Sequence, residues 1–256
     1  MVMKLNTEGL VLAEKTSAGS KRLLTILTRN DGVLRCFVRD GKESNKIFGA
    51  ATNLLCYSHF SVYEGRSSYQ LDEAVSIEFF YNLMFDVRKL ALAQYFCELA
   101  IQVIPEGASD PEYLRLMLNS LYLLNHGKKP DLLIKAVFEL RFLSLAGFMP
   151  DVIGCRECGL YECDEMYFDF SSACLWCPNC HKGGNTVKIG NPTLHGLRSA
   201  VLADPKKIFS FEASAADIAS LANLAERYTY VITERNYRTL DYYKEIIADI
   251  SASGNS

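Results

Sequence analysis

The chain has 256 residues, of which 49% are apolar and 22% charged, and its formal net charge is −3. This length leads us to expect two or three domains with enough apolar material for cores. The small negative charge argues against an indiscriminate polyanion binder. No apolar stretch is long enough to cross a membrane without a polar break, and the first residues lack the pattern of a signal peptide. We therefore expect a cytoplasmic protein that does not contact membranes.

Five short β-rich runs separated by turn residues occupy the N-terminal part of the chain, over residues 5–13, 22–28, 33–38, 54–64 and 69–79. The pair Asp31-Gly32 is typical of a hairpin, because such turns need positive φ angles. Five strands with a long polar connection between the third and fourth suit a barrel of the OB type. An SH3-like barrel stays possible, because a strand count alone does not give the topology.

Positive charge gathers in this barrel region. Eight lysines and arginines and three acidic residues lie between residues 15 and 46, an excess of five positive charges. A solvated surface is the ordinary role of such residues. The alternative is a groove for a nucleic-acid backbone, with bases stacking on aromatic side chains. The candidate aromatics are Phe37, Tyr57, Phe60 and Tyr63, at least half of which must fill the barrel, and the residues alone leave both alternatives open.

After residue 80 the spacing of apolar residues changes to that of a helix. A first helix is expected up to Val103, ended by Pro105-Glu106-Gly107. A second should begin at Asp110 as N-cap and stop at Gly127, and a third should cover residues 130–146 with Gly147 in its C-terminal cap.

Two more helices are expected over residues 192–203 and 214–233. The second of these begins with Ser214 and Asp217, which resemble a capping box with Asp in the usual place of Glu. We expect these helices to return and pack on the earlier three.

Two Cys-x-x-Cys motifs lie between the two groups of helices. Cys155 and Cys158 are followed, after eighteen residues, by Cys177 and Cys180. Four thiolates at this spacing can surround one zinc ion and fill all its coordination positions, which predicts a structural rather than a catalytic zinc. Three further candidate ligands lie nearby, namely Cys163, Cys174 and His181, whereas Cys36, Cys56 and Cys97 sit in apolar runs that suit the core.

The expected fold is therefore α+β and multidomain. It comprises an OB-fold barrel over residues 1–80, an α-helical domain in two parts over residues 81–150 and 191–248, an inserted four-cysteine zinc module over residues 151–190, and a flexible tail over residues 249–256. The four histidines match no nucleophile or metalloprotease pattern, and no phosphate-binding loop is present. We expect a protein that is not an enzyme.

The order of barrel, helices, four-cysteine insertion and returning helices resembles the RecO family of bacterial recombination mediators. The resemblance is carried by stretches in the same order along nearly the whole chain: Gly9-Leu10-Val11-Leu12, residues 27–32, residues 62–66, Ala146-Gly147-Phe148-Met149-Pro150 leading to the first cysteine pair, and Tyr237-Arg238-Thr239-Leu240.

This resemblance implies an OB-fold, a structural zinc ion and no covalent catalysis. It also implies binding of single- and double-stranded DNA, strand annealing and help in loading RecA. The implied partners are RecR and the C-terminal tail of the single-strand-binding protein. The implied location is the cytoplasm, at the nucleoid. The family's DNA-contacting cations correspond here to Lys21, Arg22, Arg35, Arg39, Lys42 and Lys46.

The connection after the third strand departs from the family's pattern. Relatives tend to carry Lys-Gly-Ala-Arg-Lys there, whereas this chain has Arg39-Asp40-Gly41-Lys42-Glu43. The two acidic residues dilute the positive charge, so we expect weaker DNA binding by the barrel and a larger contribution from partner proteins.

Two other functions stay open at this stage. A zinc-ribbon protein that binds RNA or acts in transcription would use the same barrel for RNA. A zinc enzyme would need a coordination position left for water, which four cysteines do not provide.

Overall fold

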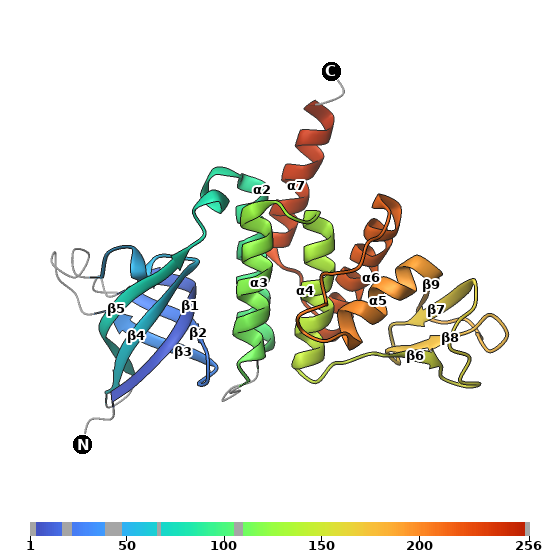
Figure 1. Ribbon diagram of the computed structural model, residues 1–256, viewed down its shortest axis with the longest axis horizontal. Helices are drawn as coiled ribbons and strands as arrows, with labels where there is room; N and C mark the ends of the chain where they lie inside the picture. The colour runs from blue at the N-terminus through green and yellow to red at the C-terminus, as the bar shows by residue number, and fades with distance from the viewer. Residues whose placement is uncertain (1–3, 17–21, 39–47, 66–67, 105–109, 254–256) are drawn as a thin grey trace. The chain divides into compact units, whose positions relative to one another are not determined.

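A computed structural model of the chain describes residues 4–16, 22–38, 48–65, 68–104 and 110–253. The chain forms two compact units (Figure 1). The first contains Met1–His126 and Tyr237–Ser256, and the second contains Gly127–Asn236. The helices that the sequence led us to expect in one domain are thus divided between two units, and the C-terminal segment belongs to the first.

In the described part of the first unit, five strands close into a barrel with the order β1-β2-β3-β5-β4. Neighbours are antiparallel except β3 and β5, which are parallel. This is the order of an OB-fold and decides against the SH3-like alternative. The strands are β1 (Lys4–Thr16), β2 (Arg22–Thr28), β3 (Val33–Val38), β4 (Cys56–Glu64) and β5 (Tyr69–Phe79), and a short 3-10 helix, η1 (Gly49–Thr52), precedes β4.

The barrel is filled by side chains from all five strands and η1. Val11, Leu24, Cys36 and Val62 are almost fully buried in it. Gly9 allows β1 and β2 to approach closely, because a Cβ at this position would lie 2.6 Å from Cγ2 of Ile26. A larger residue at this position would therefore collide with β2.

The predicted hairpin between β2 and β3 is present. Gly32 has a φ of 63°, and its carbonyl oxygen accepts hydrogen bonds from both the N–H and the hydroxyl of Thr28, each at 2.8 Å. The N–H of Asp31 donates to the same hydroxyl oxygen at 3.0 Å. These hydrogen bonds fix the geometry of the turn that connects the two strands.

Two helices follow the barrel in the first unit, α2 (Val87–Val103) and α3 (Glu112–His126), after a 3-10 turn, η2 (Tyr81–Phe85). Asp86 caps α2 by accepting hydrogen bonds from the N–H groups of Arg88 and Lys89. Asp110 accepts from the N–H of Glu112 at 2.9 Å, as the sequence predicted. The expected stop at residues 105–107 lies outside the described residues.

The first unit is completed by α7 (Arg238–Ser253), which packs on α2. The ring of Tyr237 meets the ring of Tyr95 edge-on at 5.4 Å between centroids, and the hydroxyl of Thr239 donates to the Glu98 carboxylate at 2.5 Å. The helix corrects the expected tail, which was placed at residues 249–256, because apolar residues at helical spacing continue as far as Ile250.

The helices of the second unit are α4 (Asp131–Leu145), α5 (Asn191–Leu202) and α6 (Ala215–Thr233). Each begins and ends within about two residues of its predicted limits. Ser214 caps α6: its hydroxyl oxygen accepts from the N–H of Asp217 at 3.2 Å and the hydroxyl donates to the Asp217 carboxylate at 2.6 Å. The three helices pack on one another.

The four-cysteine insertion forms a small sheet in the same unit. Its strands are β6 (Asp151–Cys155), β7 (Glu165–Asp169), β8 (Cys174–Trp176) and β9 (Thr186–Gly190), in the order β6-β8-β7-β9. The sequence did not predict these strands, because strands of three to five residues give too short a pattern to read. The ring of Phe168 on β7 packs edge-on against Tyr228 of α6, with 5.6 Å between centroids.

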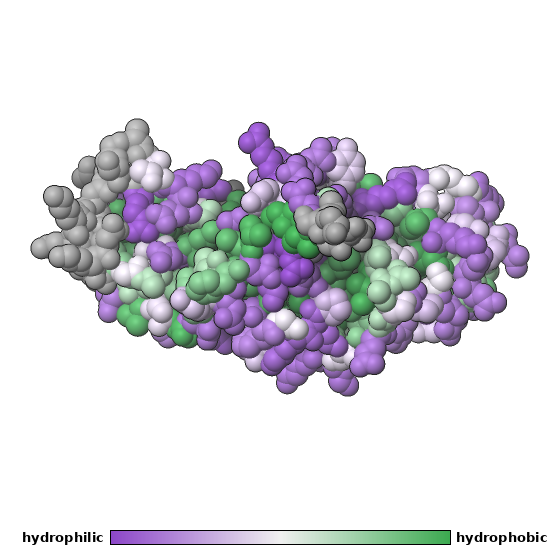
Figure 2. Space-filling model, turned by 90° about the horizontal axis from the view of Figure 1, so that it is seen from above, coloured by the Kyte–Doolittle hydropathy of each residue, from purple (hydrophilic) through white to green (hydrophobic). Residues whose placement is uncertain are grey.

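No helix among the described residues is long and apolar enough to cross a membrane. Some large apolar side chains are nevertheless exposed, such as Phe85 at 72% and Tyr81 at 61%. On the face seen in Figure 2, apolar residues lie in patches interrupted by hydrophilic ones. Tyr81 and Phe85 contact each other, with 4.8 Å between their ring centroids.

Candidate metal centre and nucleic-acid interface

The four predicted cysteines converge at one point of the second unit. The sulfur atoms of Cys155, Cys158, Cys177 and Cys180 all lie within 4.8 Å of one another. The Sγ atoms of Cys158 and Cys177 are 3.7 Å apart, much farther than the roughly 2.05 Å of a disulfide. Sulfurs bound to one zinc ion at about 2.3 Å are about 3.8 Å apart at tetrahedral angles. The cluster therefore has the size of a four-sulfur metal site.

The backbone brings the two cysteine pairs together. Cys155 ends β6 and Cys177 follows β8 directly, and these two strands are paired. Tight turns then return the chain, with the N–H of Gly159 donating to the carbonyl of Cys155 and the N–H of Cys180 donating to that of Cys177. Gly159 has a φ of 72°, a backbone conformation that favours glycine. The two turns therefore bring their sulfurs to the same point.

The thiols favour a bound cation. Burial raises the pKa of Cys155, but N–H groups led by that of Cys158 outweigh burial and lower the pKa to about 6. Hydrogen bonding with the thiols of Cys177 and Cys158 is the main cause that raises the pKa of Cys180 to about 12. Without a cation, four adjacent thiolates would repel one another, so complete ionisation requires a metal ion. The residues therefore fit a metal, and they leave no position for a catalytic water.

The three spare candidates lie outside the cluster and have other partners. The Cys163 thiol donates to the carbonyl of Glu165 at 2.8 Å, and Cys174 is buried beside the hydroxyl of Ser172. His181 stacks on Tyr167 at 3.9 Å between ring centroids. These contacts assign the three residues to the packing of the module.

Arg198 of α5 fastens the module to the helices of its unit. Its guanidinium donates to the carbonyl oxygens of Val152 and Ile153, each at 2.8 Å, and also to that of Tyr161. The same group lies 3.9 Å from the centroid of the Tyr161 ring. One arginine therefore satisfies two carbonyls of β6 and one carbonyl after the first cysteine pair. Sequence reasoning missed this role, because an arginine on a helix carries no local signal for it.

The predicted DNA-contacting cations divide into two groups. Lys21, Arg39, Lys42 and Lys46 lie outside the described residues. Of the remaining two, Arg22 is bonded to Glu14 at 2.6 Å and to the hydroxyl of Thr52 at 3.2 Å. Its side chain is only 19% exposed, so the structure directs its charge toward neighbouring parts of the barrel.

Arg35 is exposed on β3 and forms no ion pair with the described residues. Phe37, two residues along the same strand, is half-buried on the same face. The register places Phe37 opposite Leu23 of β2, and Leu23 opposite Lys15 of β1. Arg35 and Phe37 of β3 and Lys15 of β1 therefore lie on the same outer face of the sheet formed by β1, β2 and β3. Lys15 was missed because only the strand register brings it beside Phe37.

The other candidate aromatics have different surroundings. Phe60 is only 2% exposed and is the one of the four that belongs to the barrel core. Phe37, Tyr57 and Tyr63 are half-buried and lie outside that core, so the expectation that at least half of the set would fill the barrel was wrong. The hydroxyl of Tyr57 donates to the Glu8 carboxylate at 2.7 Å. Burial, followed by this hydrogen bond, raises the pKa of Tyr57 to about 12. Among the four aromatics, Phe37 is the one that lies next to a free cation in the described part of the chain.

Comparison with known proteins agrees with this architecture. Residues 1–80 match the family described as "Recombination protein O N terminal", and residues 84–240 match "Recombination protein O C terminal". The chain belongs to the RecO family of DNA repair proteins. The boundary between the two matches coincides with the end of β5, where the barrel gives way to the helices.

RecO proteins of several bacteria are similar along nearly the full length of the chain. The DNA repair protein RecO of Acetivibrio thermocellus is 32% identical over 243 residues, which cover 94% of this chain and 97% of the relative. The RecO protein of Caldicellulosiruptor saccharolyticus is 26% identical over 94% of this chain and 98% of the relative. The RecO protein of Alkaliphilus metalliredigens is also 26% identical, over 95% of this chain and 100% of the relative. Membership in the RecO family therefore rests on both domains.

Proposed function

We propose that this RecO family protein is a recombination mediator that binds single- and double-stranded DNA, promotes strand annealing and, with RecR, helps to load RecA onto DNA coated with single-strand-binding protein. It acts without covalent catalysis, in the cytoplasm at the nucleoid. The C-terminal tail of the single-strand-binding protein is part of the proposed set of partners. The family membership supports this assignment, and the barrel surface supports its DNA-binding part.

The outer face of β1, β2 and β3 is the observation that supports DNA binding. Arg35 is exposed there beside Phe37, and Lys15 lies in the same cross-strand row as that ring. Cations neutralise phosphates, and an aromatic ring stacks with an unpaired base of any sequence. Strands 2 and 3 are also the face that OB-folds use for oligonucleotides. Annealing then requires only that two strands be held while their mutual repulsion is reduced.

The four-cysteine cluster serves this function indirectly. We assign zinc to it, because four sulfur ligands in a closed site are typical of structural zinc. The ion would hold together a sheet of short strands that is too small to have a substantial core of its own. Cys155, Cys158, Cys177 and Cys180 would bind it, and Arg198 would hold the loaded module against α5.

DNA binding can be tested by measuring the affinity for a labelled single strand at several salt concentrations. Arg35→Ala should lower the slope of log K against log salt by about 0.7 to 1, because one phosphate contact is lost. Phe37→Ala should weaken binding without changing the slope, since stacking releases no ions. Arg235→Ala is the matched control, because Arg235 is an exposed arginine of the other unit. An unchanged slope for Arg35→Ala would remove β3 from the interface.

The mediator activity needs a second assay. Annealing of complementary strands coated with single-strand-binding protein should require this chain and should fall with the variants that weaken DNA binding. A preference for structured RNA over single-stranded DNA at equal salt would instead favour the alternative, a zinc-ribbon protein acting on RNA or in transcription.

A further inference from the structure

The outer surface of the barrel is divided by charge. The sequences of β2 and β3 contain Arg22 and Arg35 and no acidic residue. The sequences of β4 and β5 contain no lysine or arginine and four acidic residues, Glu64, Asp72, Glu73 and Glu78. Because the strand order is β2-β3-β5-β4, the acidic strands continue the barrel wall beyond the cationic ones. An acidic surface repels phosphates, so this half of the barrel suits a ligand other than nucleic acid.

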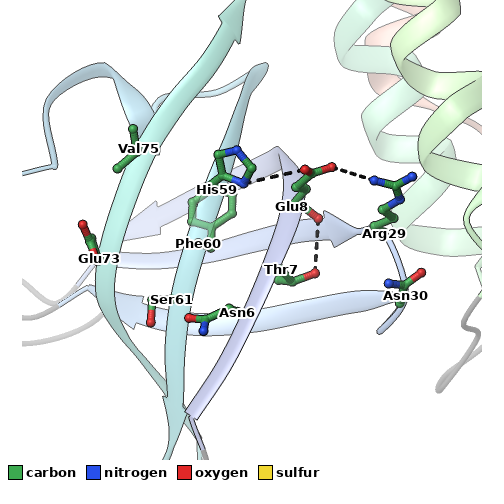
Figure 3. A pocket seen from close by; sticks show the side chains of 10 residues that line it. All are labelled: Asn6, Thr7, Glu8, Arg29, Asn30, His59, Phe60, Ser61, Glu73 and Val75. Carbon is green, nitrogen blue, oxygen red and sulfur yellow. Dashed lines mark hydrogen bonds and ion pairs between the residues drawn. The ribbon is translucent and has the colours of Figure 1, made fainter.

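An open hollow of about 540 Å³ lies on this acidic half. Side chains of three neighbouring strands line it, among them Asn6 and Glu8 of β1, His59 and Ser61 of β4, and Glu73 and Val75 of β5 (Figure 3). The register places these residues in two rows across the sheet, Glu8 with His59 and Val75, and Asn6 with Ser61 and Glu73. Each row therefore has one carboxylate.

The two carboxylates of the hollow differ in their partners. Glu8 accepts a hydrogen bond from Arg29 at 3.1 Å and from Tyr57 at 2.7 Å, and His59 lies 3.7 Å away. Its charge is therefore balanced within the barrel. Glu73 is exposed and forms no hydrogen bond or ion pair with the described residues, and Lys4, a nearby cation, is paired with Asp72 at 2.8 Å. Glu73 is therefore the carboxylate of the hollow that has no directly paired cation among the described residues.

The hydroxyl of Ser61, next to Glu73, is buried and has no hydrogen-bond partner among the described residues. The residue is only 7% exposed. A buried hydroxyl without a partner is costly, and such groups commonly have one in folded proteins. Ser61 lines the hollow and is paired across the sheet with Glu73. An unused hydrogen-bonding group and an unused carboxylate thus lie side by side.

We propose that this hollow binds an arginine side chain presented by a protein partner. The guanidinium has five N–H donors, enough to bond the Glu73 carboxylate and, once the side chains that cover it from solvent move aside, the Ser61 hydroxyl oxygen. The exposed Val75, at 53%, offers an apolar contact for the methylene groups. A metal ion does not suit the hollow, because the four cysteines form the one group of described ligand side chains close enough to hold one. The barrel then holds nucleic acid on one half and a basic partner on the other.

Binding can be measured on the full chain with a blocked peptide, Gly-Val-Arg-Val-Gly, by following the methyl resonances of Val75. The same peptide with Glu in place of Arg is the ligand control. Glu73→Gln should weaken binding of the arginine peptide about five-fold, the size of a partly screened ion pair. Asp72→Asn is the matched variant, because it removes the same charge from the adjacent, lysine-paired residue, and it should change the affinity by less than about two-fold.

Ser61→Ala should also weaken peptide binding, by about two- to five-fold, and should leave the melting temperature unchanged or higher, because the hydroxyl has no partner to lose. A lower melting temperature would show that the hydroxyl is structural and would overturn its assignment. Equal effects of Glu73→Gln and Asp72→Asn would overturn the site, as would Val75 resonances that respond to an oligonucleotide and not to the peptide.

Discussion

The ammonium group of Lys135 on α4 lies 2.9 Å from the carboxylate of Glu226 on α6. It also lies 2.9 Å from Glu139, one turn along its own helix. Lys135 and Glu139 are 2% and 0% exposed, whereas Glu226 is 28% exposed. A buried lysine thus bridges two carboxylates and links the two helices that pack most extensively in the second unit. Such an arrangement is stable only while every charge keeps its partner.

Replacing Lys135 by methionine should therefore destabilise the second unit by about 3 to 5 kcal/mol, because Glu139 would stay buried without a counter-charge. The free energy of unfolding can be measured in urea on the full chain. Lys188→Met is the control, since Lys188 forms an exposed pair with Glu165 and should matter little. Adding Glu139→Gln to Lys135→Met should recover part of the loss. Equal stability of Lys135→Met and the natural chain would contradict the role of the bridge.

Removal of the metal should unfold the β6–β9 sheet. The only tryptophan of the chain, Trp176, precedes Cys177 directly and therefore reports on this module. We expect one zinc ion per chain by elemental analysis. A strong chelator, or the substitution Cys158→Ser, should abolish the zinc and shift the Trp176 emission toward that of an exposed indole.

Cys163→Ser is the matched control for this experiment. Cys163 lies in the same module, but its thiol donates to the carbonyl of Glu165 and stands outside the cluster. The variant should keep the metal and the natural emission. Loss of zinc in Cys163→Ser, or its retention in Cys158→Ser, would show that the ligand set is different.

The N-cap of α2 should make stability depend on acid pH. Burial of Asp86 opposes ionisation, but hydrogen bonds from Arg88 and Lys89 outweigh it and hold the pKa below the ordinary 3.8. A lowered folded-state pKa means that this stabilisation is complete above about pH 4 and is lost as the pH falls through the folded value. Asp86→Ala should cost about 1 kcal/mol at neutral pH.

The substitution Asp86→Asn separates the cap from its charge. Asparagine is an equally good N-cap residue, so stability at neutral pH should be nearly kept. The acid dependence that Asp86 contributes should disappear, because the amide does not titrate. Urea unfolding at a series of pH values between 2 and 7 checks both outcomes. An unchanged pH profile in both variants would refute the assignment.

The docking of α7 on α2 should depend on Tyr237. This residue is 4% exposed and meets Tyr95 edge-on, so Tyr237→Ala should cost about 3 to 5 kcal/mol in the first unit. Hydrogen exchange measured by mass spectrometry should become faster in α7 and α2. Tyr242→Ala is the control on the same helix, because Tyr242 is 49% exposed, and it should leave the exchange unchanged.

The long elements were predictable from the sequence because their signals are local. The helix starts at Asp110 and Ser214 and the hairpin at Gly32 each follow from side chains within a few residues, and all three are present. The strands of the cysteine module and the helix α7 were not predicted. The strands are too short to give a readable pattern, and the place of α7 on α2 is fixed by distant partners, such as Glu98 for Thr239, which are 141 residues apart.

By itself, the sequence determined the order of barrel, helices and cysteine pairs, the four cysteines that come together and the family. These depend on spacing, turn chemistry and apolar period, all of which act over short distances along the chain. Only the tertiary structure decided that Arg22 is bonded to Glu14, that Phe37 lies in a row with Lys15, and that Ser61 lies beside Glu73. Strand register and barrel closure bring these residues together, and no local pattern fixes either.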